Sequence, residues 1–256
     1  MIVLAELFPK GVNELFDWRS FGPLGFNKTA MMCLISTLIC SALFIAGSRK
    51  RALVPTGIQN VAESGFELVE QSIAVEVMGE DSGKKWAPFL ATLFFWIFFI
   101  NIWEVIPGVQ FPATSRIAIP MFLALQTWLI FIVVGFKHQG PLYILKEIFP
   151  PGVPKPLYIL VAPIELISIF FIRPFSLAVR LFANMVAGHV LLTVFAVMCA
   201  ELLKHESGVY QIAFIPLPFF MLTAMTAFEL LVAVLQAYIF TILTAVYVGE
   251  AIHPQH

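Results

Sequence analysis

The sequence predicts an all-α, polytopic membrane protein whose chain crosses the bilayer about five times. Three observations predict this class: 60% of the residues are hydrophobic, 26 are Phe, and only 12% are charged. Together with a mean hydropathy of +0.91, they give 256 residues far more apolar surface than a soluble core of this length needs. The lipid bilayer is therefore the expected surrounding of most of the chain.

Composition and motifs also exclude several functions. The net charge of -1 leaves no basic stripe for phosphates, so we expect no nucleic-acid partner. Cys33, Cys40 and Cys199 lie in apolar segments and favour packing over a disulfide or a metal site. No nucleophile with a base, no zinc-binding motif and no phosphate-binding glycine loop is found. We expect a non-catalytic chain with no cofactor, no metal and no nucleotide site.

The first span is expected over residues 28–47, which are long enough to cross about 30 Å of hydrocarbon. Arg49, Lys50 and Arg51 follow at once. Positive charges favour the cytoplasmic side of a membrane. This end is therefore expected in the cytoplasm, and residues 1–27 are expected outside.

Residues 57–85 are predicted to form an amphipathic helix on the cytoplasmic surface. Acidic residues recur among apolar ones at helical spacing: Glu63, Glu67, Glu70, Glu76, Glu80 and Asp81. So many charges do not suit a membrane span, whereas their spacing suits a surface helix.

Two more spans, 86–106 and 117–136, are expected to form a helical hairpin. Glu104 lies at the outer end of the first of them, where a solvated carboxylate is expected rather than an ion-binding one. Lys137, Lys146 and Lys155 follow the second, which places that connection in the cytoplasm, in agreement with the first span.

The last two segments, 157–203 and 208–250, are predicted as long, steeply tilted helices within a single membrane domain, 1–256. A continuous helix over residues 157–200 would be about 66 Å long, twice the bilayer thickness. Steep tilt, a bend or a break would accommodate this length. Ordinary spans with apolar extensions would do so too, and hydropathy leaves these alternatives open.

Arg180 is the most informative residue, because a guanidinium within a membrane span costs about 2.5–3.5 kcal/mol on insertion scales. No carboxylate lies three or four residues from it, so its counter-charge is expected to come from elsewhere. A functional role is favoured over an arginine that snorkels to the interface or pairs structurally. At about 100° per residue, Arg173 and Asn184 share its face, whereas His189 lies opposite.

The last segment carries one charged residue between 209 and 249, Glu229, which shares a face with Gln236. Since Glu229 is the ionisable residue there that can meet an imidazole, the sequence favours a His189–Glu229 pair acting as a proton relay over a merely structural histidine. Glu165 lies about 60° from Arg180 on a regular helix, nearer the cytoplasmic end.

Two motifs carry a family resemblance. The first reads Arg173-Pro174-Phe175-Ser176-Leu177-Ala178-Val179-Arg180-Leu181-Phe182-Ala183-Asn184-Met185-Val186-Ala187-Gly188-His189, and the second covers residues 235–244. Their order and spacing resemble subunit a of the F-type ATP synthase, the stator proton-channel subunit of its membrane sector. The resemblance covers essentially the whole chain.

The resemblance implies a role for each polar residue. Arg180 would be the essential arginine of the family, with Asn184 as its neighbour and Gln236 facing it from the last helix. His189 and Glu229 would be the proton-accepting pair of an outer aqueous half-channel. A second half-channel would open to the cytoplasm near Glu165 and Arg173. Protons would be loaded and unloaded there on rotor carboxylates during ATP synthesis.

The resemblance also implies partners and a location. The partners would be a rotor ring of c subunits, whose carboxylate faces Arg180, and the b subunits of the peripheral stalk. A bacterial plasma membrane is favoured over the mitochondrial inner membrane, with the N-terminus outside and the C-terminus in the cytoplasm. The alternative, a self-contained proton-coupled secondary transporter, is disfavoured because the first three and last two spans show no internal repeat.

Overall fold

The computed structural model describes residues 27–49, 55–106, 113–149, 154–204 and 216–252, and their regular structure is entirely helical. Five helical stretches are long and apolar enough to cross a membrane: Lys28–Arg49, Glu80–Ile102, Ala118–Gln139, Tyr158–Ala200 and Pro216–Ile252. These findings confirm the predicted all-α, polytopic class. The expected extracytoplasmic segment 1–27 lies, except for its last residue, outside the described residues.

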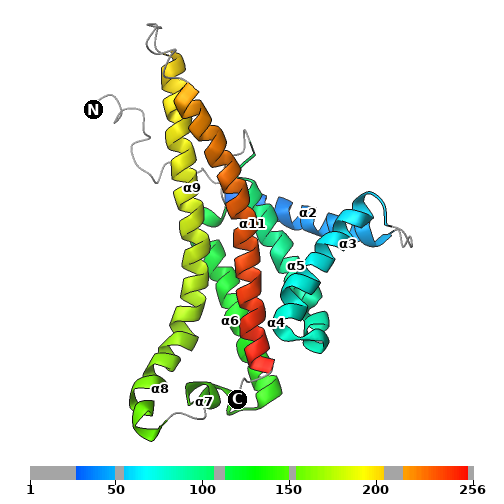
Figure 1. Ribbon diagram of the computed structural model, residues 1–256, viewed down its shortest axis with the longest axis vertical. Helices are drawn as coiled ribbons and strands as arrows, with labels where there is room; N and C mark the ends of the chain where they lie inside the picture. The colour runs from blue at the N-terminus through cyan, green and yellow to red at the C-terminus, as the bar shows by residue number, and fades with distance from the viewer. Residues whose placement is uncertain (1–26, 50–54, 107–112, 150–153, 205–215, 253–256) are drawn as a thin grey trace.

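The first span is α2, Lys28–Arg49. Two tryptophans attach it to the second span. Trp96 within that span donates its indole N–H to the Thr37 hydroxyl at 2.9 Å, and Trp103, the residue after the span, donates to the Ser36 hydroxyl at 2.7 Å. Figure 1 shows α2 leading away from α9 towards α3. This helix is therefore fixed mainly to its nearest neighbours in the chain.

The predicted surface helix is shorter than 57–85. It consists of α3 (Ile58–Val69), the π-helical turn η2 (Glu70–Val75) and α4 (Glu76–Met78). Gly79 then adopts a φ of 78°, which glycine tolerates and which ends the helix. Residues 80–85 instead begin α5, Glu80–Ile102, so the second span starts six residues earlier than expected.

The second and third spans are α5 and α6 (Ala118–Gln139), separated by the 3₁₀ turn η3 (Ala113–Ser115) and residues outside the description. A short helix, α7 (Tyr143–Ile148), follows α6. Tyr143 is buried against Gly135 of α6, where no other residue type leaves room for the ring. This close approach folds α7 back onto the end of α6.

The fourth long segment is helical from 158 to 204 and contains one irregular turn. It comprises α8 (Tyr158–Ile167), the π-helical turn η5 (Ser168–Ile172) and α9 (Arg173–Lys204). Figure 1 shows α8 leaving the line of α9 near the end of the molecule where α7 lies and α11 ends. The long helix therefore bends, one of the outcomes that its length allowed.

The last helix, α11, is continuous over 37 residues, Pro216–Ile252. Its expected first residues, 208–215, lie outside the description. It runs beside α9 and also contacts α5 and α6 (Figure 1). Gln139 of α6 donates its side-chain N–H to the carbonyls of Glu250 and Ala251, which stabilises the C-terminal end of α11.

Candidate functional site

Arg180 lies on the exposed side of α9. Its neighbours Leu177, Ala178 and Leu181 are buried in the core, whereas Arg180 and Asn184 are exposed. Within the described residues Arg180 makes no ion pair. The guanidinium therefore lies on the surface of the helix pair, where a group from another polypeptide could approach it.

Asn184 and Gln236 join α9 to α11 one helical turn from Arg180. The Asn184 side-chain N–H donates to the Gln236 side-chain carbonyl at 2.8 Å. Gln236 is 2% exposed and Asn184 is exposed, so the pair connects the interior with the surface that carries Arg180.

His189 lies on the opposite, buried side of α9, as the half-turn spacing predicted. Its Nδ1 atom is 3.9 Å from Oε1 of Glu104. Glu104 is 1% exposed, so the expectation of a solvated carboxylate was wrong. Hydropathy predicts how deep in the membrane Glu104 lies, but not whether its side chain faces solvent or the protein interior. The turn at the end of α5 directs the side chain inward.

Glu104 lies two residues beyond Ile102, the last residue of α5, and its surroundings favour the neutral acid. Burial, and then the nearby carboxylate of Glu229, raise the pKa of Glu104 to about 9. Beside it, Asn101 accepts a hydrogen bond from the Thr114 hydroxyl at 2.8 Å. Glu104 is therefore a buried carboxyl group that keeps its proton at neutral pH.

Glu229 is 3% exposed and lies against Gly188, the residue before His189. A methyl group at position 188 would overlap the Glu229 carboxyl. Among the described residues, Oε2 of Glu229 and Oε1 of Glu104 have no hydrogen-bond partner. The structure thus brings Glu104, His189 and Glu229 into one buried cluster, in which Glu104 is the member that sequence reasoning missed.

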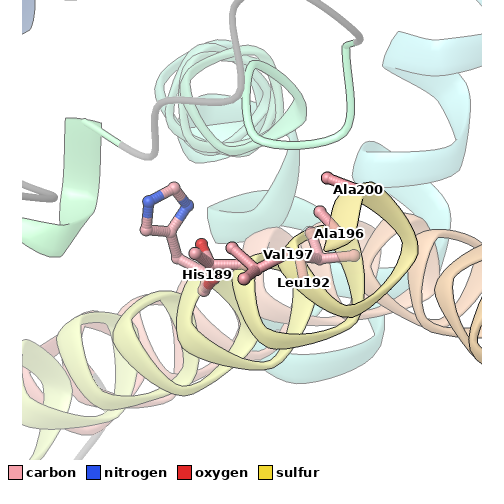
Figure 2. A pocket seen from close by; sticks show the side chains of 6 residues that line it. His189, Leu192, Ala196, Val197 and Ala200 are labelled. Atoms are coloured by element: carbon pink, nitrogen blue, oxygen red, sulfur yellow. Dashed lines mark hydrogen bonds between the residues drawn. The ribbon is translucent and has the colours of Figure 1, made fainter. Parts of the chain in front are cut away.

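A cavity of about 280 Å³ adjoins this cluster. His189 lies at one end, and the lining continues along α9 through Leu192, Thr193, Ala196, Val197 and Ala200 (Figure 2). The cavity runs along α9 in the direction away from Arg180. It provides space beside the imidazole for water molecules.

Arg173 lies in a separate cluster near the C-terminal end of α11. Its guanidinium is 3.6 Å from the Glu147 carboxylate and 3.3 Å from that of Glu250, and it lies 5.2 Å from the centroid of the Tyr247 ring. Two carboxylates therefore neutralise Arg173, in contrast to Arg180. Within the described residues, no group of three His, Cys, Asp or Glu side chains could hold a metal ion.

Glu165 is partly exposed on α8. The expected angle of about 60° between Glu165 and Arg180 assumed a regular α-helix. The π turn η5 lies between them, so that angle was wrong. A π turn inserts about one residue and rotates the preceding segment by about 100°.

We expect Arg173→Gln to destabilise the protein, because it leaves the Glu147 and Glu250 carboxylates without their shared cation. Since these groups are partly exposed, the loss should be about 1–2 kcal/mol, seen as a fall of a few degrees in Tm of the purified complex. Lys84→Gln, which breaks an exposed pair with Glu80, is the control. An equal fall for both variants would contradict the assigned cluster.

The fold and the site define a multi-pass membrane protein with titratable side chains between its long helices. The chain belongs to the ATP synthase A chain family, whose sequence model matches residues 29–249. It is 43% identical to the ATP synthase subunit a of Frankia alni, over 100% of this chain and 90% of that protein. It is 42% identical to that of Acidiphilium cryptum, over 95% and 97% of the two chains.

Family membership settles the general role. The chain is a proton-translocating, non-catalytic subunit of the membrane sector of an ATP synthase, and it assembles with other ATP synthase subunits. This finding displaces the alternative of a self-contained proton-coupled transporter.

Proposed function

We propose that this chain is the stator of the membrane sector and provides two aqueous half-channels, which load and unload protons on rotor-ring carboxylates. The observation that carries the proposal is the division of α9 into two sides. Arg180 is exposed on one side, whereas His189 is buried with Glu104 and Glu229 on the other. A proton acceptor and a fixed cation are thus kept apart on one rigid helix.

The outer half-channel begins at the cavity beside His189. Protons pass through the cluster of His189, Glu104 and Glu229, whose buried groups can each gain and lose a proton. The Asn184–Gln236 pair then leads from the cluster to the surface that carries Arg180. Its amides orient the proton path and cannot themselves ionise.

Arg180 separates the two half-channels. A guanidinium stays protonated at every relevant pH, so Arg180 cannot relay a proton. Its charge holds an approaching rotor carboxylate ionised, and that carboxylate can return to lipid only after it is protonated. A direct proton leak is prevented by the same charge.

The cytoplasmic half-channel lies near Glu165 and Arg173. Because Glu147 and Glu250 neutralise Arg173, this arginine lines the path without attracting the rotor carboxylate. Protons leave by Glu165, which is partly exposed on α8. Each proton that crosses supplies about 2.3 kcal/mol per 100 mV of membrane potential.

The c-subunit ring faces Arg180, and the peripheral-stalk b subunits complete the stator. We place the N-terminus outside and the C-terminus in the cytoplasm of a bacterial plasma membrane. The basic residues Arg49, Lys137 and Lys146 support this orientation. The relatives named above support the location, since they come from bacteria, Frankia alni and Acidiphilium cryptum.

The outer path is tested by ATP synthesis in inverted vesicles after an acid–base jump. We expect His189→Ala and Glu104→Gln to lower the initial rate at least tenfold, because each removes a proton-transfer group. In inverted vesicles the lumen corresponds to the extracytoplasmic side of the membrane. The rate of ATP synthesis should fall most steeply in these variants when the lumen is least acidic. His138→Ala, an exposed histidine at the end of α6, is the control. Equal rates in all three variants would overturn the proposal.

Coupling between Asn184 and Gln236 gives a second test. We expect Asn184→Ala and Gln236→Ala each to slow ATP-driven proton pumping several-fold, and the double variant to be little slower than either one. Loss of a shared hydrogen bond predicts an interaction of about 1 kcal/mol in the double-mutant cycle. Strictly multiplicative effects would show that the two amides act separately.

A further inference from the structure

The π turn η5, between Glu165 and Arg180, has a cause in the sequence. Pro174 has no backbone N–H, so a regular α-helix would leave the Phe170 carbonyl without its donor. The Arg173 N–H instead donates to the Ser168 carbonyl, five residues back, which is the π-helical pattern. The Ile169 carbonyl then loses both possible helical donors, because one is engaged with Ser168 and the other would be Pro174.

Trp128 of α6 supplies the missing donor. Its indole N–H donates to the Ile169 carbonyl at 3.0 Å, and its ring packs against Phe170 with 5.9 Å between the centroids. Ile169 is 1% exposed, so water is not available to satisfy its carbonyl. An indole N–H can only donate, and it therefore suits an acceptor that the helix leaves free.

We propose that Trp128 is a positioning residue for the cytoplasmic half-channel: it stabilises the π turn that sets the side of the long helix on which Glu165 lies relative to Arg180. The turn inserts about one residue, so its loss would rotate α8 by about 100° against α9. The role of Glu165 in proton exit rests on the proposed function, whereas the stabilisation of the π turn by Trp128 does not depend on it.

The geometry is tested by cysteine labelling in the complete complex. Cys33, Cys40 and Cys199 are first replaced by Ser, and single cysteines are then introduced as Ile164→Cys, Glu165→Cys and Leu166→Cys. A water-soluble thiol reagent is applied to inverted vesicles, whose outer surface is the cytoplasmic side. We expect Trp128→Phe to move the most reactive position by one residue.

Trp96→Phe is the matched control, since it removes an indole hydrogen bond to Thr37 on α2 and should leave the labelling pattern unchanged. The same pattern in Trp128→Phe and Trp96→Phe would overturn the proposal. A shift in both variants would also overturn it, because the effect would then not be specific to η5.

Pro174→Ala gives an independent test should Trp128→Phe assemble poorly. Position 174 regains an N–H, so a regular helix can form and the Ile169 carbonyl can accept from Arg173. We expect the labelling pattern to shift in Pro174→Ala alone. In the double variant Pro174→Ala with Trp128→Phe, each labelling rate should differ less than twofold from that of Pro174→Ala, because the turn that Trp128 stabilises is already lost. A further shift would show that Trp128 does not act through the turn.

Proton pumping connects the geometry to transport. We expect Trp128→Phe to lower ATP-driven pumping at least threefold and to shift its dependence on buffer pH in the same direction as Glu165→Gln. A merely structural defect would lower the amount of assembled complex, and the pumping rate would then fall by the same factor at every pH. That result would overturn the positioning role. If Glu165→Gln pumps normally while the labelling shift persists, the proposed exit path is wrong and the control of α8 by Trp128 stands.

Discussion

Arg180→Ala should abolish coupled proton pumping, to below about 1% of the native rate, in complexes that still assemble. Without the guanidinium, nothing in the described part of α9 favours the ionised form of a rotor carboxylate at this position. The carboxylate would stay protonated, and rotation would no longer require proton exchange. Pumping is measured in inverted vesicles, and assembly is measured by recovery of the purified complex.

Arg49→Ala is the matched control, because Arg49 is an exposed arginine at the end of α2. It should retain pumping within twofold. After removal of the soluble head, Arg180→Ala vesicles should also conduct protons passively, since the barrier between the half-channels is gone. Coupled pumping that survives in Arg180→Ala would make this arginine structural and remove the basis of the proposed mechanism.

Gly188→Ala should lower the rate of ATP synthesis about tenfold or more. The added methyl group would occupy the space of the Glu229 carboxyl, which is buried and cannot move into solvent. A displacement of about 1 Å in a reacting group can cost up to 10²-fold. Gly249→Ala is the control on α11, because a methyl group there would make only ordinary contacts with Met78.

A compensating change sharpens this prediction. Glu229→Asp is shorter by one methylene, so combined with Gly188→Ala it should recover part of the rate. Recovery would show that the glycine serves the carboxyl group. If the rate of Gly188→Ala equals that of Gly249→Ala, the assigned contact has no role in transport.

Much of the fold follows from local properties of the sequence. Long apolar runs predict the spans, and regular helical spacing correctly separates Arg180 from His189. The end of the surface helix was missed, because a positive φ at Gly79 overrides an acidic pattern that continues beyond it. Sequence periodicity predicts which residues share a face of a helix, but it does not predict where the backbone changes direction.

The site was predictable only where its members share a helix. Glu104 reaches His189 through a turn after α5, a tertiary contact that no local pattern encodes. Trp128 is similar, since its residue type predicts an interfacial anchor and not a donor to another helix. Pro174 did carry a signal, because proline inside a helix demands a local change in hydrogen bonding.

The nine-residue interval between Arg180 and His189 also restricts how such a chain can change in length. One inserted residue would turn His189 by about 100° and direct it away from Glu104. A whole inserted turn would nearly restore the direction but displace the imidazole about 5.4 Å along the axis. We therefore expect insertions and deletions to be tolerated near Gly140, which forms a turn with a φ of 83°, and to be rejected between the two residues.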